Sequence, residues 1–177
     1  EIWERNTKAM KEQIEKFGFD QVLLVPANVK LDDAFDKEMT KGYSESNYWG
    51  IRKTEIVSDI RSSKNRIILV HKNNADNLYD TKETLPILKE TLGKKAGSFK
   101  GEEGMTIEEY AILQRVFFEE TGEHLDEKGS TWLPGSKVGA RVVCASWSPG
   151  DGRLDVSAAA LEGSGPSVGC RPSRCFL

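Results

Sequence analysis

The sequence predicts an α+β fold, with helices early in the chain and a small antiparallel sheet late. Two observations carry this prediction. Apolar residues recur at helical spacing in residues 1–17 and 106–122, whereas short alternating segments separated by turns follow Gly129. At 177 residues, with 38% hydrophobic and 30% charged residues, the chain has the composition of one globular domain rather than of a disordered protein.

The first part of the chain combines helices with apolar strands. Residues 1–17 are predicted to form an amphipathic helix, because Ile2, Met10 and Ile14 share a face and Gly18 offers a C-terminal stop. Shorter elements follow from similar patterns: strands at 21–26 and 66–70, and short helices near 32–39, 51–60 and 86–92. The glycine- and charge-rich residues 93–104 are expected to form a surface linker.

The second part begins with the clearest helix and then turns to strands. Thr106 and Glu109 fit a capping box, and Gly122 marks the helix end. Strands are predicted at 140–147, 153–158 and 168–177, with a tight turn at 148–152 between the first two. In the last of these strands Pro172 limits ladder hydrogen bonding.

Charge and hydropathy exclude broad classes of partner. A net charge of −3 argues against a wide nucleic-acid or membrane surface, and no apolar run is long enough to span a bilayer. No signal peptide is visible, but the chain starts at Glu1 without a methionine, so its localisation, cytoplasmic or surface-displayed, stays open.

The three cysteines, Cys144, Cys170 and Cys175, gather near the C-terminus. An odd number argues against a fully paired secreted framework and favours small buried hydrophobes in a reducing compartment, although one disulfide plus a free thiol remains an alternative. With only two histidines and no metal-ligand spacing, no metal site and no cofactor are predicted.

Residues with catalytic potential lack the partners that catalysis needs. The chain has no phosphate-binding loop, nucleophile elbow or dinucleotide-binding glycine motif. Cys144 needs a nearby base to act as a nucleophile, and His124 follows a helix stop, where histidines more often contact the backbone than catalyse. Arg171 and Arg174 have two interpretations: they hold an anionic ligand, or they pair with acidic residues of the long helix and fix the last strand. No catalytic residue is therefore assigned.

A series of segments late in the chain carries a family resemblance. In order, these are EETGEHLD, STWLPGS, GARVVCASW, DGRLDV and GCRPSR. Together they resemble the variable proteins of diversity-generating retroelements, closest to archaeal and related bacterial members with a C-type lectin fold of the formylglycine-generating-enzyme type. The resemblance covers residues 104–177 well and residues 1–100 only loosely. It implies a single lectin-like domain over residues 1–177, whose part from 101 to 177 carries a variable region at about 130–177.

The resemblance also gives a reason for the small residues that crowd positions 145–167. In such systems a reverse transcriptase misreads template adenines, so that Asn codons become many other codons, among them those for Ser, Gly, Asp and Ala. An ordinary flexible loop is the alternative explanation. The implied ligand-binding variable positions are Ser146, Ser148, Gly150, Asp155, Ser157, Ala158, Ala159, Gly163, Ser164, Gly165 and Ser167.

Strand alternation separates these positions from a fixed scaffold. Leu154 and Val156 are expected to point inward, and Asp155 and Ser157 outward, where substitution costs little. Trp147 is expected to fill the core beneath the sheet. The resemblance therefore implies a non-enzymatic binding protein for a protein or cell-surface ligand of unknown identity. Two alternatives are a relative of the formylglycine-generating oxidases, with Cys170 and Cys175 as its reactive pair, and an intracellular interaction module.

Overall fold

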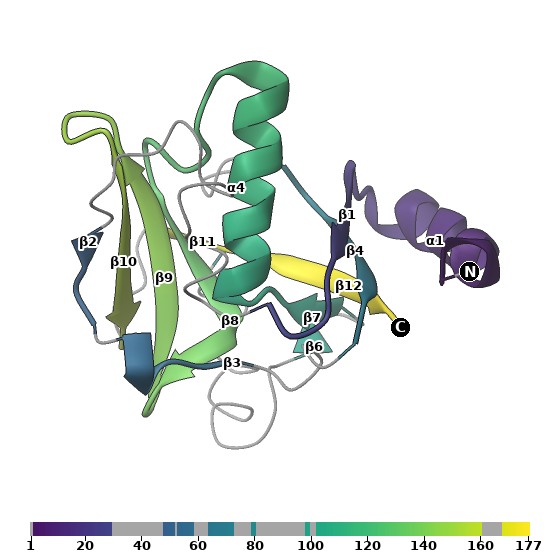
Figure 1. Ribbon diagram of the computed structural model, residues 1–177, viewed down its shortest axis with the longest axis horizontal. Coiled ribbons are helices and arrows are strands. Elements are labelled where there is room, and N and C mark those ends of the chain that lie inside the picture. The colour runs from purple at the N-terminus through teal and green to yellow at the C-terminus, as the bar shows by residue number, and fades with distance from the viewer. Residues whose placement is uncertain are drawn as a thin grey trace.

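A computed structural model describes residues 2–29, 48–51, 53–58, 64–72, 79–80, 98–99, 102–160 and 168–177. It is an α+β structure in which two sheets enclose a central helix (Figure 1). The described elements are α1 (Ile2–Phe17), β1 (Gln21–Val25), β2 (Tyr48–Trp49), η1 (Lys53–Glu55), β3 (Val57–Ser58), β4 (Arg66–Val70), β5 (Tyr79–Asp80), β6 (Ser98–Phe99), β7 (Glu102–Gly104), α4 (Ile107–Thr121), β8 (Ser130–Val138), β9 (Arg141–Ser148), β10 (Arg153–Ala159), β11 (Val168–Cys170) and β12 (Pro172–Phe176).

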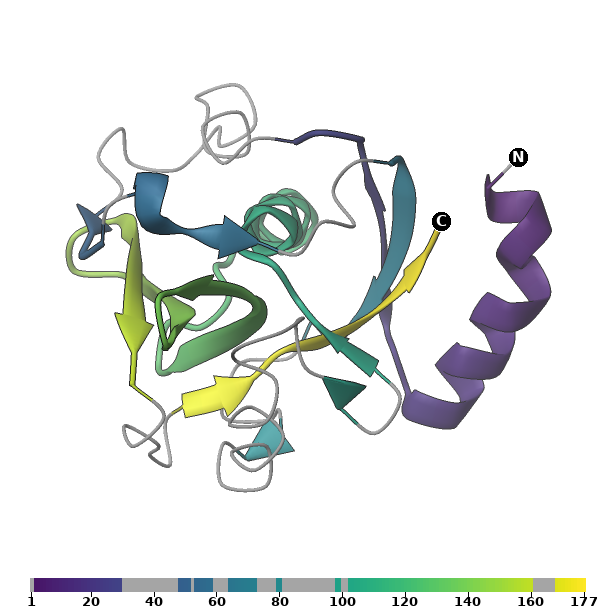
Figure 2. The same ribbon diagram turned by 90° about the horizontal axis from the view of Figure 1, so that it is seen from below.

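The first sheet joins the two ends of the chain. Its strand order is β1-β4-β12-β7-β6, so the C-terminal strand lies between a strand from the first half and β7. Cys175 pairs with Ile68, and Ser173 pairs with both Val70 and Glu103, in antiparallel registers. The early and late parts of the sequence therefore share one sheet, and α1 packs on the face that points away from α4 (Figure 2).

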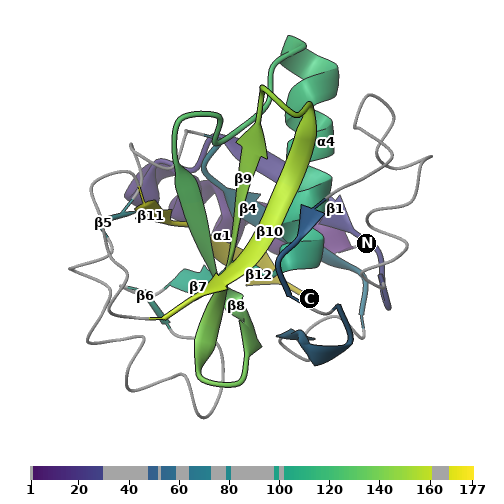
Figure 3. The same cartoon turned by 90° about the vertical axis from the view of Figure 1, so that its left-hand side faces the viewer.

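The second sheet is built on the hairpins of β8, β9 and β10. Its order is β2-β10-β9-β8-β11-β5, with β3 paired to the far end of β8. Neighbouring hairpin strands are antiparallel, whereas β2 with β10 and β11 with β8 are parallel. In Figure 3 this sheet lies nearer the viewer than α4, and β10 passes across the helix.

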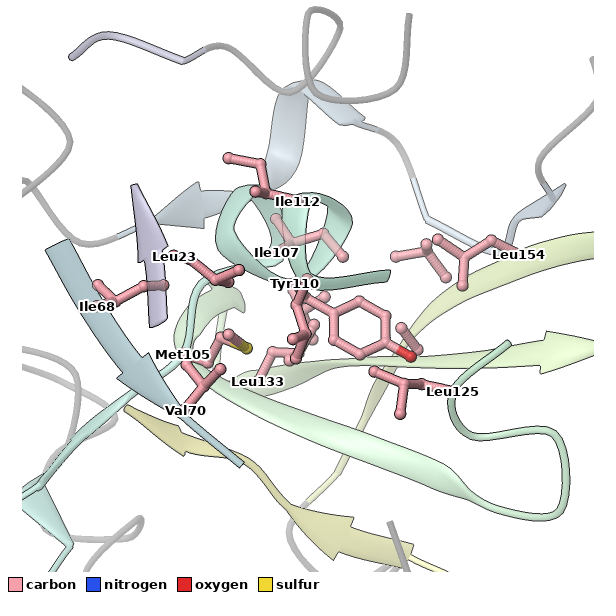
Figure 4. Packing of buried hydrophobic residues seen from close by; sticks show 14 of the residues in the cluster. Leu23, Ile68, Val70, Met105, Ile107, Tyr110, Ile112, Leu125, Leu133 and Leu154 are labelled. Carbon is pink, nitrogen blue, oxygen red and sulfur yellow. The ribbon is translucent and has the colours of Figure 1, made fainter. Parts of the chain in front are cut away.

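The main core lies between the two sheets and around α4. Figure 4 shows Tyr110 of this helix between Leu23 and Ile68 on one side and Leu125 and Leu154 on the other. The helix begins with the predicted capping box: Glu109 N–H donates to Thr106 Oγ1 at 3.3 Å, and Thr106 N–H donates to Glu109 Oε2 at 3.0 Å. It ends at Gly122, whose φ of 74° is the left-handed conformation that glycine adopts without strain.

The two sheets meet where β7 crosses β8. Gly135 N–H donates to the carbonyl of Met105 at 2.9 Å. A β-carbon on Gly135 would lie 2.5 Å from the carbonyl oxygen of Gly104, and one on Gly104 would lie 2.5 Å from Cβ of Pro134. Only glycine lets the two backbones come this close, and β8 is irregular here, with a register shift between Leu133 and Lys137.

A buried ionic network fixes the start of the last strand. Arg171 Nη2 donates to both carboxylate oxygens of Asp126 at 3.0 Å, and Nη1 donates to the carbonyl of His71 at 2.6 Å. The hydroxyl of Tyr110 donates to Asp126 Oδ2 at 2.8 Å and accepts from Gln114 at 2.7 Å. Burial, and then the Asp126 carboxylate, raise the pKa of Tyr110 well above its ordinary value, so its hydroxyl stays protonated.

Most of the predicted elements are confirmed. The helices over 1–17 and 106–122 and the strands at 21–26 and 66–70 are present to within two residues, as are the strand, turn and strand between 140 and 158. The last predicted strand divides into β11 and β12, because Arg171 lies between strands of different sheets. The expected helices near 32–39 and 86–92 lie outside the described residues.

Two predictions from local pattern are wrong, and the strands β2, β5 and β8 were not predicted. Residues 98–99 and 102–104 of the expected linker form strands, because β7 pairs with the C-terminal β12. Within the expected 51–60 helix, η1 is followed by β3, because Ser58 pairs with Ser136. The whole of β8 was not predicted, since Pro134 and Gly135 interrupt its alternating pattern.

Candidate functional site

The candidate site is the outer face of the β9–β10 hairpin, which points away from α4. Ser146 lies opposite Asp155, and Ser148 lies opposite Arg153. Cross-strand partners of an antiparallel pair share one face of a sheet, so the hairpin places these four side chains together. Ser157 continues the same face along β10 and is exposed, while the four others are partly exposed. We call Ser146, Ser148, Arg153, Asp155 and Ser157 the display face.

The residues between the display positions point the other way. Trp147 is 6% exposed, Leu154 1% and Val156 0%, and all three belong to the main core around α4. The predicted inward positions of Leu154 and Val156 and the outward positions of Asp155 and Ser157 are therefore confirmed. The hairpin has a fixed inner face, so its outer side chains do not determine how it packs.

Polar contacts tie the display face to the hairpin turn. Arg153 Nε donates to Asp155 Oδ1 at 3.0 Å, and its Nη2 lies 3.4 Å from Asp151 Oδ2. Ser148 Oγ donates to the same Asp151 oxygen at 2.9 Å. Gly150 is exposed in this turn, and a β-carbon there would meet no atom within 4 Å. All of these groups are open to water, so each contact contributes little to stability and is free to change.

Two of the expected variable positions lie elsewhere. Ala158 packs against the main core, on the opposite side of β10 from Asp155 and Ser157. Ala159 shares their face but packs against a second, smaller cluster. Neither alanine therefore contributes an open side chain to the display face. The remaining expected positions, Gly163, Ser164, Gly165 and Ser167, lie outside the described residues.

The smaller cluster limits the display face on one side. It contains Trp132, Val142, Cys144 and Cys170, none of which is more than 6% exposed. Trp132 is therefore buried, but on the opposite side of the sheet from Trp147. This second core was not predicted, although two apolar residues at outward strand positions, Val142 and Cys144, were its signal.

The cysteines do not form a reactive pair. All three are free thiols, and Cys144 lies in the small cluster with its Sγ 3.0 Å from Ser157 Oγ. Cys170 belongs to the second sheet and the small cluster, whereas Cys175 belongs to the first sheet and packs against the main core. The two cysteines that the oxidase alternative needs in one site therefore lie in different sheets. Among the described residues, no three His, Cys, Asp or Glu side chains gather as a metal site.

The surroundings of Arg171 give it a structural role. Its side chain is 0% exposed and bound to Asp126. The prediction that it fixes the last strand is confirmed, but its acidic partner lies after the long helix instead of on it. Arg174 lies in β12, opposite Leu69 of β4, and is partly exposed.

His124 lies directly beneath the β9 strand. Its ring stacks between Phe118, with centroids 4.5 Å apart, and Trp147, with centroids 3.4 Å apart. Trp147 N–H also donates to the carbonyl of Asp126 at 3.1 Å, so the loop after α4 holds β9 at two points. Burial lowers the pKa of His124 to about 4. The ring therefore acts as a neutral packing element between Phe118 and Trp147.

We expect His124 to make stability fall in mild acid. Its folded pKa of about 4 is below its ordinary value, so the unfolded chain binds more protons between these values and unfolding becomes easier as pH falls through this window. Replacing His124 with phenylalanine should remove about 1–2 kcal/mol of the stability difference between about pH 7.5 and about pH 4.5, allowing for solvent screening. Urea denaturation at both pH values measures this difference.

The second histidine provides the comparison. The pKa of His71 is also lowered, mainly by burial. His71→Phe should therefore remove a different part of the acid dependence from the part that His124→Phe removes. An unchanged pH dependence in His124→Phe would show that the stacked ring does not control the acid response.

Neither described helix, α1 nor α4, is long and apolar enough to cross a membrane. Comparison with models of protein families, with curated proteins and with solved structures found no match to this chain. The function must therefore be inferred from the residues and geometry of this chain itself.

Proposed function

We propose that this chain is a ligand-binding variable protein of a diversity-generating retroelement, whose display face recognises a protein or cell-surface ligand on a C-type lectin scaffold. The observation that carries the proposal is the separation of roles within one hairpin. Small, polar side chains such as Ser146 and Asp155 share an outer face, while Trp147, Leu154 and Val156 between them are buried. This arrangement lets recognition residues change without loss of the fold.

The composition of the face agrees with diversification at template Asn codons. Ser146, Ser148, Asp155 and Ser157 are all residues that adenine misreading of such a codon produces, and Gly150 in the turn is another. Arg153 was not among the expected variable positions, and its two acidic contacts suit a fixed organiser of the turn. Ala158 faces the core, so we no longer include it among the ligand-contacting positions.

A substitution scan tests whether the face tolerates change. Replacing Ser146, Ser148 or Ser157 with tyrosine should alter the free energy of unfolding by less than about 0.5 kcal/mol, because the new ring extends into solvent. The inward control, Val156→Ala, should cost about 2 kcal/mol, since it removes fully buried methyl groups. Urea denaturation provides both values, and equal costs on the two faces would contradict the separation of roles.

The proposal itself is tested in the encoding DNA. We expect a near-copy of the segment that encodes residues 130–177, close to a reverse transcriptase gene, with differences confined to template adenines. The differing codons should include those of Ser146, Ser148, Asp155 and Ser157 and should omit those of Leu154 and Val156. Substitutions spread equally over inward and outward codons, or no such repeat, would overturn the proposal.

A further inference from the structure

A short segment runs from β10 to β8 past the start of α4. It consists of residues 48–51 and 53–58, and we call it the strap. At one end β2 pairs with β10 opposite Asp155 and Val156, and at the other end β3 pairs with the far end of β8. Figure 1 shows the strap in blue, from β2 beside β10 to β3 below α4. It therefore borders the display face at one end and contacts the central helix at the other.

The strap is held by a small amount of buried surface. Each of its strands is two residues long. Among its described side chains, Ile51 and Ile56 pack against the main core and are only partly buried. Val57 is 59% exposed, and Thr54 and Glu55 are exposed as well. Segments with few buried apolar contacts open locally at a lower free energy than the core, so polar contacts at the ends of the strap have a large influence on its opening.

A chain of hydrogen bonds joins the β3 end of the strap to α4. Ile107 N–H donates to Ser136 Oγ at 3.0 Å, and Ser136 Oγ lies 2.7 Å from Ser58 Oγ. Ser58 Oγ lies 3.0 and 2.9 Å from the two carboxylate oxygens of Glu108. An ionised carboxylate only accepts, so the single proton of Ser58 points to Glu108 and that of Ser136 points to Ser58. The chain thus ends on a charge, and hydrogen bonds to charged groups are the stronger kind.

We propose that the strap opens and closes as one unit, and that the Ser58–Glu108 contact at its β3 end controls exposure of the β10 edge at its β2 end. In the closed strap, Gly50 N–H donates to the carbonyl of Val156 at 2.8 Å. Opening breaks this bond and the pairing opposite Asp155. Backbone groups of β10 beside the display face then become accessible to water.

The carboxyl group of Glu108 gives this opening a pH dependence. Burial raises the pKa of Glu108 above its ordinary value, and hydrogen bonds from its own backbone, Ser58 and Thr106 offset only part of the rise. Opening returns the carboxyl group to water and lowers its pKa, so the open state binds fewer protons than the closed state. The strap therefore opens more readily as the pH rises from 4.5, the ordinary pKa of the group, and the effect levels off once Glu108 is ionised in the closed state.

Other charged groups lie on the elements around Glu108. Its neighbour Glu109 also raises its pKa, but Glu109 is itself bound to Arg66 of β4, with 2.9 Å between Arg66 Nε and Glu109 Oε1. Both members of that pair are buried beside the core, so opening of the strap leaves them together. The remaining charged residues of β8 and η1 are Lys137, Lys53 and Glu55. A variant that changes Glu108 alone separates its effect from theirs.

Hydrogen exchange of single amides, followed by NMR on the whole chain near neutral pH, tests whether the two ends are linked. Ser58→Ala should speed the exchange of Gly50 N–H at least about fivefold, because it removes a hydrogen bond to a charged group at the opposite end. Thr54→Ala, at an exposed position of the same strap, is the matched control and should change this rate by less than about twofold. Equal effects of the two variants, or a response confined to the β3 amides, would overturn the proposal.

The pH profile of the same amides tests the role of the Glu108 charge. After correction for intrinsic exchange, the strap should be better protected at about pH 5 than at about pH 7, opposite to the acid response expected from His124. Glu108→Gln keeps an oxygen acceptor for Ser58 and should abolish this difference, whereas Glu123→Gln, at an exposed carboxylate after α4, should retain it. Strap protection that falls in acid, or a difference that persists in Glu108→Gln, would contradict the inference. No ligand is needed, so the result is independent of what the display face binds.

Discussion

Arg171→Ala should destabilise the protein by about 3–5 kcal/mol, because it leaves a buried carboxylate without its cation. Asp126 and Arg171 are both 0% exposed, and the guanidinium contacts both carboxylate oxygens at 3.0 Å. The substitution also removes the hydrogen bond to the carbonyl of His71 and the cation that lies 5.7 Å from the centre of the Tyr110 ring. Urea denaturation monitored by circular dichroism measures the loss.

The matched control is an ion pair on the water-facing side of α4. Arg115 pairs with Glu119 one turn along α4, with the glutamate 56% exposed, so Arg115→Ala should cost only about 0.5 kcal/mol. The double variant Arg171→Met with Asp126→Leu should be more stable than either single variant, because no charge remains buried. Equal losses for Arg171→Ala and Arg115→Ala would contradict the structural role of the buried pair.

Gly135→Ala is the second substitution with a large expected effect. It should lower the free energy of unfolding by about 3–5 kcal/mol, because the new β-carbon collides with backbone atoms rather than with a movable side chain. That carbon would lie 2.5 Å from the oxygen of Gly104 and 2.8 Å from the carbonyl carbon of Met105. Relief requires β7 and β8 to separate, which weakens the hydrogen bond from Gly135 N–H to Met105. Thermal and urea unfolding should both reveal the loss.

Gly150→Ala provides the control for this substitution. Its β-carbon would meet no atom within 4 Å, and its φ lies outside the left-handed region. We expect a change within about 0.5 kcal/mol, or a small gain from the stiffer unfolded chain. If the two alanines had the same effect, the close crossing of β7 and β8 would not be a constraint on the fold.

Local sequence patterns predicted the elements whose partners are close in the chain. The capping box of α4 depends on Thr106 and Glu109, three residues apart, and the β9–β10 hairpin depends on its own turn. The elements that were missed depend on distant segments. β7 has the composition of a linker, and only its pairing with Pro172 and Ser173 makes it a strand. In β8 the pattern is interrupted at Pro134 and Gly135, where this strand crosses Gly104.

The candidate site was predicted in part for a similar reason. Period-two alternation identified the outward positions of Asp155 and Ser157 correctly. The codon argument that added Ala158 and Ala159 was less successful, because it depends on residue type alone and gives no signal of which way a side chain points or what it packs against. The small cluster around Trp132 brings together β8, β9 and β11, and no local pattern shows that these strands are neighbours.

The position of β12 makes the first sheet depend on translation beyond the β9–β10 hairpin. This strand follows the β9–β10 hairpin in the sequence, yet it lies inside the first sheet between β4 and β7, with Arg171 buried just before it. A premature stop codon or a shifted reading frame in the preceding hairpin removes the middle of that sheet. Such a product cannot fold and becomes a substrate for proteolysis, whereas a missense change on the outer face is retained.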